Sequence, residues 1–97
     1  MKSSTEKLTE KYLFQQVKKA GGECVKMTSP GWPDRLVILP QNSMFFAEVK
    51  DTKITLRPTQ KIVFPVIEKL GVKLYIVTTK EQVDQCILNH TITRTQQ

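Results

Sequence analysis

The chain has little of what many enzyme active sites are built from. Its 97 residues include one histidine and two cysteines. His90 lies near a polar tail, which argues against a histidine-based metal site or a Ser/His/Asp triad. Cys24 and Cys86 form neither a CxxC pair nor a disulfide framework. We therefore expect both cysteines to be small, buried apolar residues in a reducing compartment.

Long apolar runs are also missing. No stretch is long enough to span a membrane, and the amino terminus has no signal-peptide pattern, so we expect a cytoplasmic protein with no membrane partner. The length predicts a single domain over residues 1–97. A chain this short buries a modest fraction of its surface, so a partner subunit would be a natural source of stability.

Positive charge is what the chain has in excess. Fifteen Lys and Arg residues against nine Asp and Glu residues give a net charge of +6. Such a surface attracts polyanions and releases counterions when it binds them. Nucleic acid is therefore favoured as a partner over the alternative of a merely soluble basic surface.

The hydrophobic pattern predicts the element order α, β, β, β, α, β, α. The expected helices cover residues 6–20, 58–70 and 79–88. The expected strands cover residues 23–28, 35–39, 44–50 and 72–78. We expect residues 51–57 to form a loop and residues 89–97 to form a polar tail that frays. The last strand is apolar on both faces, so we expect it in the middle of the sheet. A βαβ crossover lays it parallel to an earlier strand in a mixed sheet flanked by helices.

Two helices carry apolar stripes that predict their buried faces. The stripe of the first helix consists of Leu8, Tyr12, Leu13, Val17 and Ala20, and that of the second of Ile62, Val63, Val66, Ile67 and Leu70. Pro65 lies inside the second helix and predicts a kink there.

Two carboxylates and a lysine on neighbouring strands are the main candidates for chemistry. Side chains alternate along a strand, so Glu48 and Lys50 share a face. A three-residue turn after the preceding strand would set Asp34 directly opposite Glu48. A two-residue turn would put them on opposite faces unless a bulge corrects the register. We therefore predict an odd-length turn or a bulge.

Two carboxylates that close together call for a cation, and hard oxygen ligands select Mg²⁺ or Mn²⁺. The first helix offers a third acid, because Glu10 lies one turn from the buried Leu13 position. Glu6 is better explained as a solvated acid in the first turn, where the helix dipole favours it. Lys50 either reaches water from a strand end or acts on the attacking water and the developing charge, and its coupling to Glu48 favours the second interpretation.

Several segments together resemble a known family. Residues 31–35 (GWPDR), residues 46–50 (FAEVK) and Gln60 resemble the VRR-NUC domain of the PD-(D/E)XK nuclease superfamily, and residues 6–13 and 18–22 look like its short, standalone viral members. The resemblance covers nearly the whole chain. It implies an α/β fold with the restriction-endonuclease-like αβββαβ core, and a host-cytoplasmic location if the chain is viral.

The resemblance also implies a metal-dependent endodeoxyribonuclease. By similarity, Asp34, Glu48 and the Val49 carbonyl bind Mg²⁺ or Mn²⁺, and Lys50 is the catalytic lysine. Glu10 would support the metal, and Gln60 would position the site or the DNA. Standalone viral members are thought to act as homodimers on branched DNA such as four-way (Holliday) junctions, which connects them with DNA repair.

Further residues are candidates for contact with DNA. The candidate phosphate-binding cations are Lys26, Arg35, Lys53, Arg57 and Lys61. Trp32 stands where the family usually has a small or aliphatic residue, and it either packs on the sheet or stacks on an exposed base.

Two other classes of function remain open. A non-catalytic nucleic-acid-binding module would bind DNA without cutting it when metal is added. A small interaction protein would show neither metal affinity nor salt-dependent DNA binding.

Overall fold

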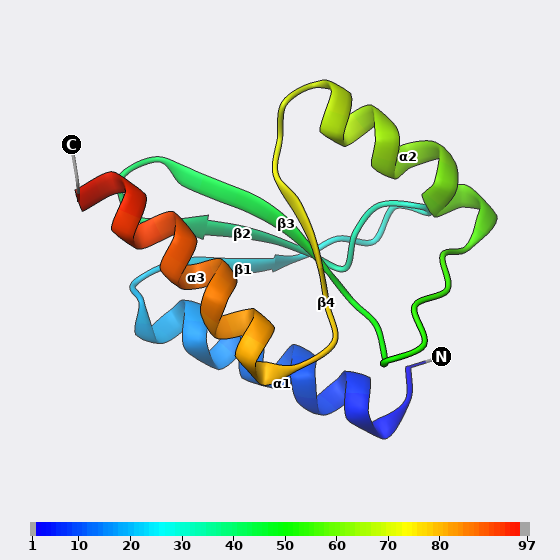
Figure 1. Ribbon diagram of the computed structural model, residues 1–97, viewed down its shortest axis with the longest axis horizontal. Helices are drawn as coiled ribbons and strands as arrows, with labels where there is room; N and C mark the ends of the chain where they lie inside the picture. The colour runs from blue at the N-terminus through cyan, green and yellow to red at the C-terminus, as the bar shows by residue number, and fades with distance from the viewer. Residues whose placement is uncertain (1, 96–97) are drawn as a thin grey trace.

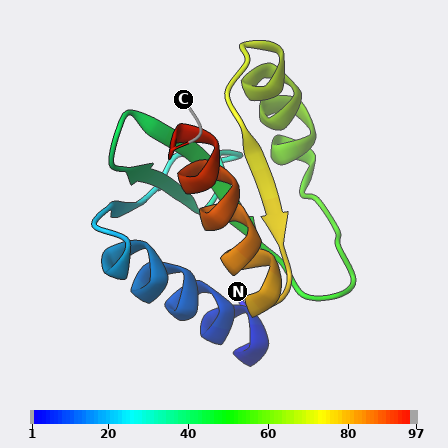
Figure 2. The same ribbon diagram turned by 60° about the vertical axis from the view of Figure 1, so that its left-hand side comes forward.

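The chain folds into a four-stranded sheet with helices on both faces (Figures 1 and 2). The computed structural model describes the backbone of residues 2–95 and the side chains of residues 2–91. The elements are α1 (Ser4–Lys19), β1 (Glu23–Lys26), β2 (Arg35–Leu39), β3 (Ser43–Val49), α2 (Pro58–Lys69), β4 (Leu74–Val77) and α3 (Lys80–Thr95). This confirms the predicted α/β class and element order. Among the described helices, none combines the length and the apolar character that a membrane crossing requires.

The strand order is β1-β2-β3-β4, with β1, β2 and β3 antiparallel and β4 parallel to β3. The mixed sheet and the parallel crossover are confirmed. The expectation that the last strand is central is wrong, because β4 lies at the edge. Its two faces are apolar because α2 covers one and α3 the other, whereas within the described residues only β3 pairs with it.

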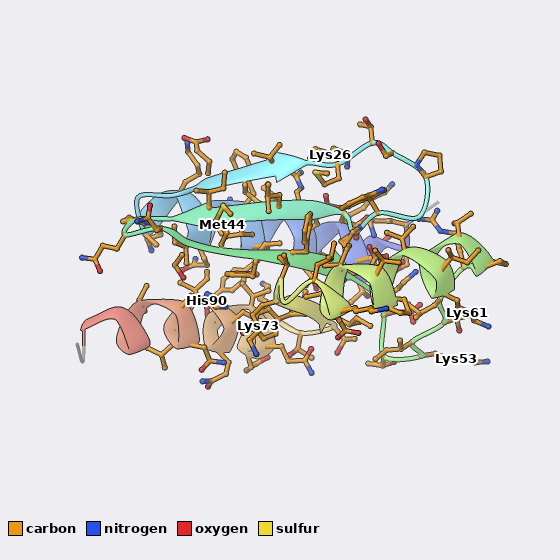
Figure 3. The ribbon with its side chains drawn as sticks, turned by 90° about the horizontal axis from the view of Figure 1, so that it is seen from above. Lys26, Met44, Lys53, Lys61, Lys73 and His90 are labelled. Atoms are coloured by element: carbon orange, nitrogen blue, oxygen red, sulfur yellow. The ribbon has the colours of Figure 1, made fainter. Side chains whose placement is uncertain are left out.

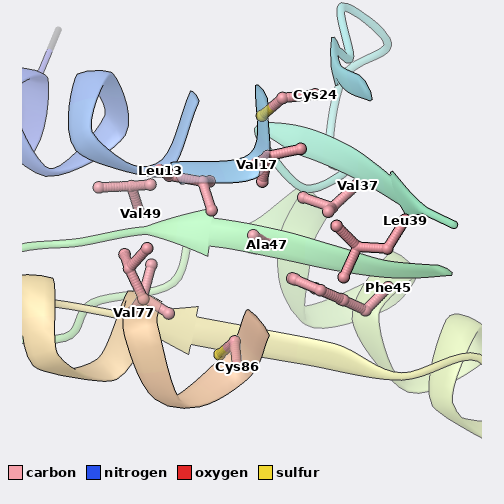
Figure 4. Packing of buried hydrophobic residues seen from close by; sticks show 11 residues of the cluster. Leu13, Val17, Cys24, Val37, Leu39, Phe45, Ala47, Val49, Val77 and Cys86 are labelled. Atoms are coloured by element: carbon pink, nitrogen blue, oxygen red, sulfur yellow. The ribbon is translucent and has the colours of Figure 1, made fainter. Parts of the chain in front are cut away.

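The main core lies between the sheet and the pair α1 and α3 (Figure 4). Phe45, Ala47 and Val49 of β3 all point into it, as the strand alternation predicts, and each is 0 % exposed. Cys24 and Cys86 are free thiols in the same cluster, which confirms their expected burial. Burial raises the pKa of the Cys86 thiol to about 11.

Helix α1 begins with a capping box, in which Ser3 and Glu6 each accept a hydrogen bond from the other's backbone N–H. Leu13 and Val17 are fully buried as predicted, but Leu8 is 61 % exposed. The predicted stripe is wrong at Leu8 because the helix turns Thr9 and Glu10 toward the sheet instead.

Helix α2 starts with Pro58 and continues through Pro65 to Lys69. Its predicted buried stripe is largely wrong, since Ile62, Val66 and Leu70 are 70 %, 53 % and 76 % exposed. The face toward the sheet consists of Gln60, Phe64 and Ile67. A polar contact explains this rotation, because the Gln60 amide is hydrogen-bonded to the buried Glu48 carboxylate.

Helix α3 extends to Thr95, so its expected end near Leu88 is wrong. His90 holds the added turns against the sheet. Its ring lies 4.6 Å from the Phe45 ring centre, and its nitrogens are 2.8 Å from Ser43 Oγ and 3.0 Å from the Tyr75 hydroxyl. Residues 96 and 97 of the expected frayed tail lie outside the described residues.

Candidate metal centre

The turn between β2 and β3 sets the register of the site. Leu39 pairs with Ser43, so three residues form the turn, and Gln41 and Asn42 adopt positive φ angles of 68° and 64°. The predicted odd-length turn is confirmed. Continuing the register one residue beyond the Arg35–Ala47 pair puts Asp34 opposite Glu48.

A tight loop places Asp34 opposite Glu48. Pro33 is fully buried, and Gly31 has a φ of 83°. A side-chain carbon at position 31 would lie 2.8 Å from the Thr59 carbonyl oxygen, so only glycine lets the loop pack this closely on the first turn of α2.

Asp34 and Glu48 are each held by the other's strand. The Asp34 N–H donates to Glu48 Oε1 at 3.0 Å, and the Val49 N–H donates to Asp34 Oδ2 at 2.8 Å. The Glu48 side chain is 1 % exposed and that of Asp34 is 15 % exposed. Backbone N–H groups therefore fix the positions of two neighbouring carboxylates, of which Glu48 is buried and Asp34 is partly exposed.

Gln60 and Lys50 complete the surroundings of Glu48. Gln60 Nε2 donates to Glu48 Oε2 at 2.8 Å, while Gln60 Oε1 accepts from the Arg57 N–H at 2.9 Å. Lys50 Nζ lies 3.3 Å from the same Glu48 oxygen, as expected for two residues on one strand face. Gln60 therefore orients the carboxylate from the first turn of α2, and Lys50 places a positive charge beside it.

Lys2 contributes a cation that no sequence motif predicts. Its Nζ lies 2.8 Å from Asp34 Oδ2 and 3.0 Å from the Val49 carbonyl oxygen. A carboxylate and a backbone carbonyl thus converge on one positive charge. Lys2 precedes the capped helix and belongs to no motif, so only the folded chain brings it here.

The donor set suits a hard divalent cation. In the described part of the chain, no cluster of three or more His, Cys, Asp or Glu side chains forms. Asp34, Glu48 and the Val49 carbonyl supply oxygen only, which Mg²⁺ and Mn²⁺ prefer, and Mg²⁺ commonly binds through one or two carboxylates with waters and substrate phosphates. The Lys2 ammonium shows that two of these oxygens already accommodate a cation.

The two acids of α1 lie in different surroundings, and among the described residues Glu10 does not contact the other candidate metal ligands. Glu10 is buried as predicted, but it accepts from Arg35 Nε at 2.8 Å and lies 3.4 Å from Lys26 Nζ. Among the described residues, no hydrogen bond or ion pair joins it to Asp34 or Glu48. Arg35 and Asp34 are neighbours on one strand and point to opposite faces, so Glu10 lies on the other side of the sheet.

Glu6 is the α1 acid whose pKa is affected by the lysines of the site. Hydrogen bonds from Ser3 lower the pKa of its carboxyl, chiefly the one from the Ser3 backbone, and the positive charges of Lys2 and Lys50 lower it further. Glu6 lies in the first turn of the helix, as expected, and there it completes the capping box with Ser3. Helical periodicity had pointed to Glu10 because it measures burial, and burial alone does not distinguish the two faces of the sheet.

The candidate DNA contacts divide into exposed and enclosed residues. The Arg35 side chain is only 16 % exposed and is bonded to Glu10 and the Cys24 carbonyl. Lys53, Arg57 and Lys61 are exposed, and Figure 3 shows Lys53 and Lys61 at the same end of the molecule.

Two further candidates combine packing with exposure. Trp32 packs on Phe46 with ring centres 5.7 Å apart and remains 39 % exposed, so the expected packing is present. The Lys26 side chain is 61 % exposed despite its contact with Glu10.

Comparison with known proteins identifies relatives. No protein-family model matches the chain. Over 44 residues it is 48 % identical to "Putative nuclease p44" of Acyrthosiphon pisum secondary endosymbiont phage 1; the match covers 42 % of this chain and about half (47 %) of that relative. A solved structure of a VRR_NUC domain is 31 % identical and superposes with a TM-score of 0.79, covering 88 % of this chain and 96 % of that chain. Sequence and fold agree over nearly the full length of that domain, so the chain belongs to the VRR-NUC domain family.

Proposed function

We propose that the protein is a metal-dependent nuclease that hydrolyses phosphodiester bonds in DNA. The observation that carries the proposal is the hydrogen-bonded assembly of Asp34 with Glu48, with Lys50 lying 3.3 Å from the Glu48 carboxylate. Family membership and the name of the phage relative support the same chemistry.

Asp34, Glu48 and the Val49 carbonyl would hold Mg²⁺ or Mn²⁺. When bound, such an ion polarises a phosphoryl oxygen and lowers the pKa of a water molecule. Gln60 keeps Glu48 in a fixed orientation, and Glu48 Oε1 retains a lone pair beyond the one taken by the Asp34 N–H. Lys50, held 3.3 Å from Glu48, places positive charge where negative charge develops on the phosphate.

Branched DNA, such as a four-way junction, is the proposed substrate. The exposed cations Lys53, Arg57 and Lys61 lie on and before the first turns of α2, which also carry Gln60. Lysines and arginines bind phosphates without reading sequence, so the enzyme would select the structure of DNA rather than its sequence.

A homodimer would present two such sites to two strands. Helix α2 contacts β4, and exposed apolar side chains lie on one face of β1, β2 and β3. These side chains are Val25, Ile38 and Met44, which are 43 %, 36 % and 50 % exposed. We name this apolar surface the sheet face. A twofold axis would place it against its own copy.

A cleavage assay tests the enzymatic proposal. Duplex, single-stranded, flap and four-way-junction DNA are incubated with Mg²⁺, with Mn²⁺ and with chelator. We expect metal-dependent cleavage, greatest on branched DNA. Lys50→Ala should reduce turnover at least about a hundredfold while leaving junction binding within about threefold. Removal of a single group that stabilises charge in the transition state lowers kcat by about this factor in other enzymes.

Lys19→Ala is the matched control, since it removes an exposed lysine from the far end of α1. Loss of junction binding in Lys50→Ala would mean that the lysine holds DNA. Binding without cleavage under every condition would support the second candidate, a non-catalytic module. The Lys2 ammonium on the metal ligands is the observation that favours that candidate, because it satisfies their charge without a metal.

A further inference from the structure

A basic groove lies on the side of the sheet covered by α1. It has a volume of about 420 Å³. The lining residues are Lys7, Glu10, Lys11 and Phe14 of α1, Lys26 of β1 and Arg35 of β2. We name it the α1 groove. Of the residues expected at the metal centre it contains only Glu10, which is bonded to Arg35 on the α1 side of the sheet.

The charges of the α1 groove are unbalanced in favour of cations. Its one carboxylate, Glu10, is already shared by Arg35 and Lys26. Lys7 and Lys11 are exposed, and in the described part of the chain no ion pair involves either. They stand four residues apart on one helix, where like charges repel and destabilise the helix. An anionic ligand in the groove would remove this repulsion.

An aromatic ring is part of the same groove. Phe14 follows Lys7 by two helical turns and is 41 % exposed. The guanidinium of Arg35 lies 5.6 Å from the ring centre, and Glu10 fixes that guanidinium from the other side. Phe14 is therefore a supported, partly exposed ring among cations, which is the composition of a platform on which a nucleic-acid base stacks.

The α1 groove lies on the opposite face of the sheet from the candidate metal centre, and the chain connects the two directly. Arg35 directly follows Asp34 on the chain; its side chain is bonded to Glu10 on the α1 side, whereas the Asp34 side chain points to the other face. A strand that passes the metal centre could thus continue around the end of the sheet into the groove.

We propose that the α1 groove binds a single unpaired nucleic-acid strand, with its phosphates on Lys7, Lys11 and Lys26 and a base on Phe14. Duplex DNA keeps its bases stacked inside, so an exposed ring adds little to duplex binding, whereas an unpaired strand gains from both the ring and the cations. This inference rests on the proposed nuclease function for the identity of the polyanion, and it adds a second contact site for the substrate.

Binding in chelator tests the groove separately from catalysis. Fluorescence anisotropy follows a labelled oligothymidylate and a duplex of equal length between 50 and 200 mM salt, concentrations across which phosphate contacts dominate the affinity. The variant is Lys7→Ala/Lys11→Ala. Its matched control is Lys18→Ala/Lys19→Ala, which removes two lysines from the last turn of the same helix.

The groove variant should bind the single strand about tenfold more weakly at low salt. The slope of log affinity against log salt should fall by about 1.4, because each lost phosphate contact on a single strand contributes about 0.7. The control should leave both quantities nearly unchanged. Equal losses in the two double variants would overturn the proposal.

Phe14→Ala separates stacking from charge. It should weaken binding of the single strand about fivefold or more and leave duplex binding nearly unchanged, since stacking on an aromatic ring contributes to unpaired bases only. Phe14→Leu, which keeps an apolar side chain, should show the same loss. Equal effects on single strand and duplex would show that the ring has a packing role only. An absence of nuclease activity would not change any of these binding measurements.

Discussion

Lys2 is the residue whose position bears most directly on the metal centre. Its ammonium uses Asp34 Oδ2 and the Val49 carbonyl, two of the three groups proposed to hold the metal. Two cations at one pair of oxygens repel each other strongly in a partly buried site. Metal binding therefore requires Lys2 to leave.

We predict that Lys2→Ala raises the affinity for Mn²⁺. A hydrogen bond to a charged group contributes about 1.5–3 kcal/mol, so removing the competitor should strengthen binding about tenfold or more. Isothermal titration calorimetry measures the change, and Lys19→Ala serves as the control. Equal affinities in the three proteins would show that Lys2 does not compete, whereas no binding in any of them would contradict the metal centre itself.

At the scale of elements, the length of the β2–β3 turn decides whether the site exists. Three residues in the turn place Asp34 opposite Glu48, and removing one residue shifts the register by one. The shift would exchange the faces of β3, so that Glu48 would face the core and Val49 the site.

Deletion of Asn42 should therefore abolish Mn²⁺ binding and lower the melting temperature, because a carboxylate would enter the core or the hairpin would distort. Asn42→Gly keeps the turn length and suits the positive φ of 64°, so its free energy of unfolding should stay within about 1 kcal/mol of the parent. Calorimetry and thermal unfolding monitored by circular dichroism measure both. Retained metal binding in the deletion variant would contradict the register argument.

Helix α3 depends on a histidine whose pKa is lowered by the fold. Burial lowers the pKa of His90, and the positive charge of Lys73 lowers it further. The neutral ring is therefore favoured in the folded chain, while the unfolded chain protonates at about pH 6.5. The contribution to stability is present above that pH and is lost as the pH falls from there through the folded pKa.

We expect the free energy of unfolding to decrease between pH 7.5 and 5.5 by more in the parent protein than in His90→Gln. Glutamine keeps hydrogen-bonding groups at this position but does not titrate. Urea unfolding at several pH values gives the difference, which isolates His90 from the carboxylates common to both proteins. Parallel pH profiles would contradict the assignment.

For the whole molecule, the sheet face explains where a second copy would bind. One face of the sheet is covered by α1 and α3, whereas α2 covers only the β4 side of the other. The remaining apolar side chains lie on neighbouring strands, since Ile38 pairs with Met44 and Val25 with Leu36.

Met44→Glu should therefore convert the proposed dimer to a monomer without unfolding it, because Met44 is 50 % exposed in the single chain. Leu8→Glu introduces the same charge at a 61 % exposed leucine of α1 and should leave the dimer intact. Sedimentation velocity distinguishes the two outcomes. A monomeric parent protein, or a dimeric Met44→Glu variant, would contradict the proposed interface.

The sequence by itself determined the element order, the faces of β3 and the requirement for an odd-length turn. These follow from alternation and turn length, which are local properties of the chain. Motifs also identified Asp34, Glu48, Lys50 and Gln60, which the fold brings together through direct hydrogen bonds and one ion pair.

The position of β4, the buried face of α2 and the surroundings of the two α1 acids depend on contacts between distant parts of the chain. An apolar pattern indicates that both faces of a strand are covered, but it does not show whether another strand pairs with each of its edges. The pattern of β4 therefore predicts a central strand, although β4 is an edge strand. The rotation of α2 depends on the bond between Gln60 and Glu48. The surroundings of Glu10 depend on its ion pair with Arg35 on the α1 side of the sheet. Lys2 reaches Asp34 from 32 positions away in the chain, and no local pattern encodes a contact over that distance.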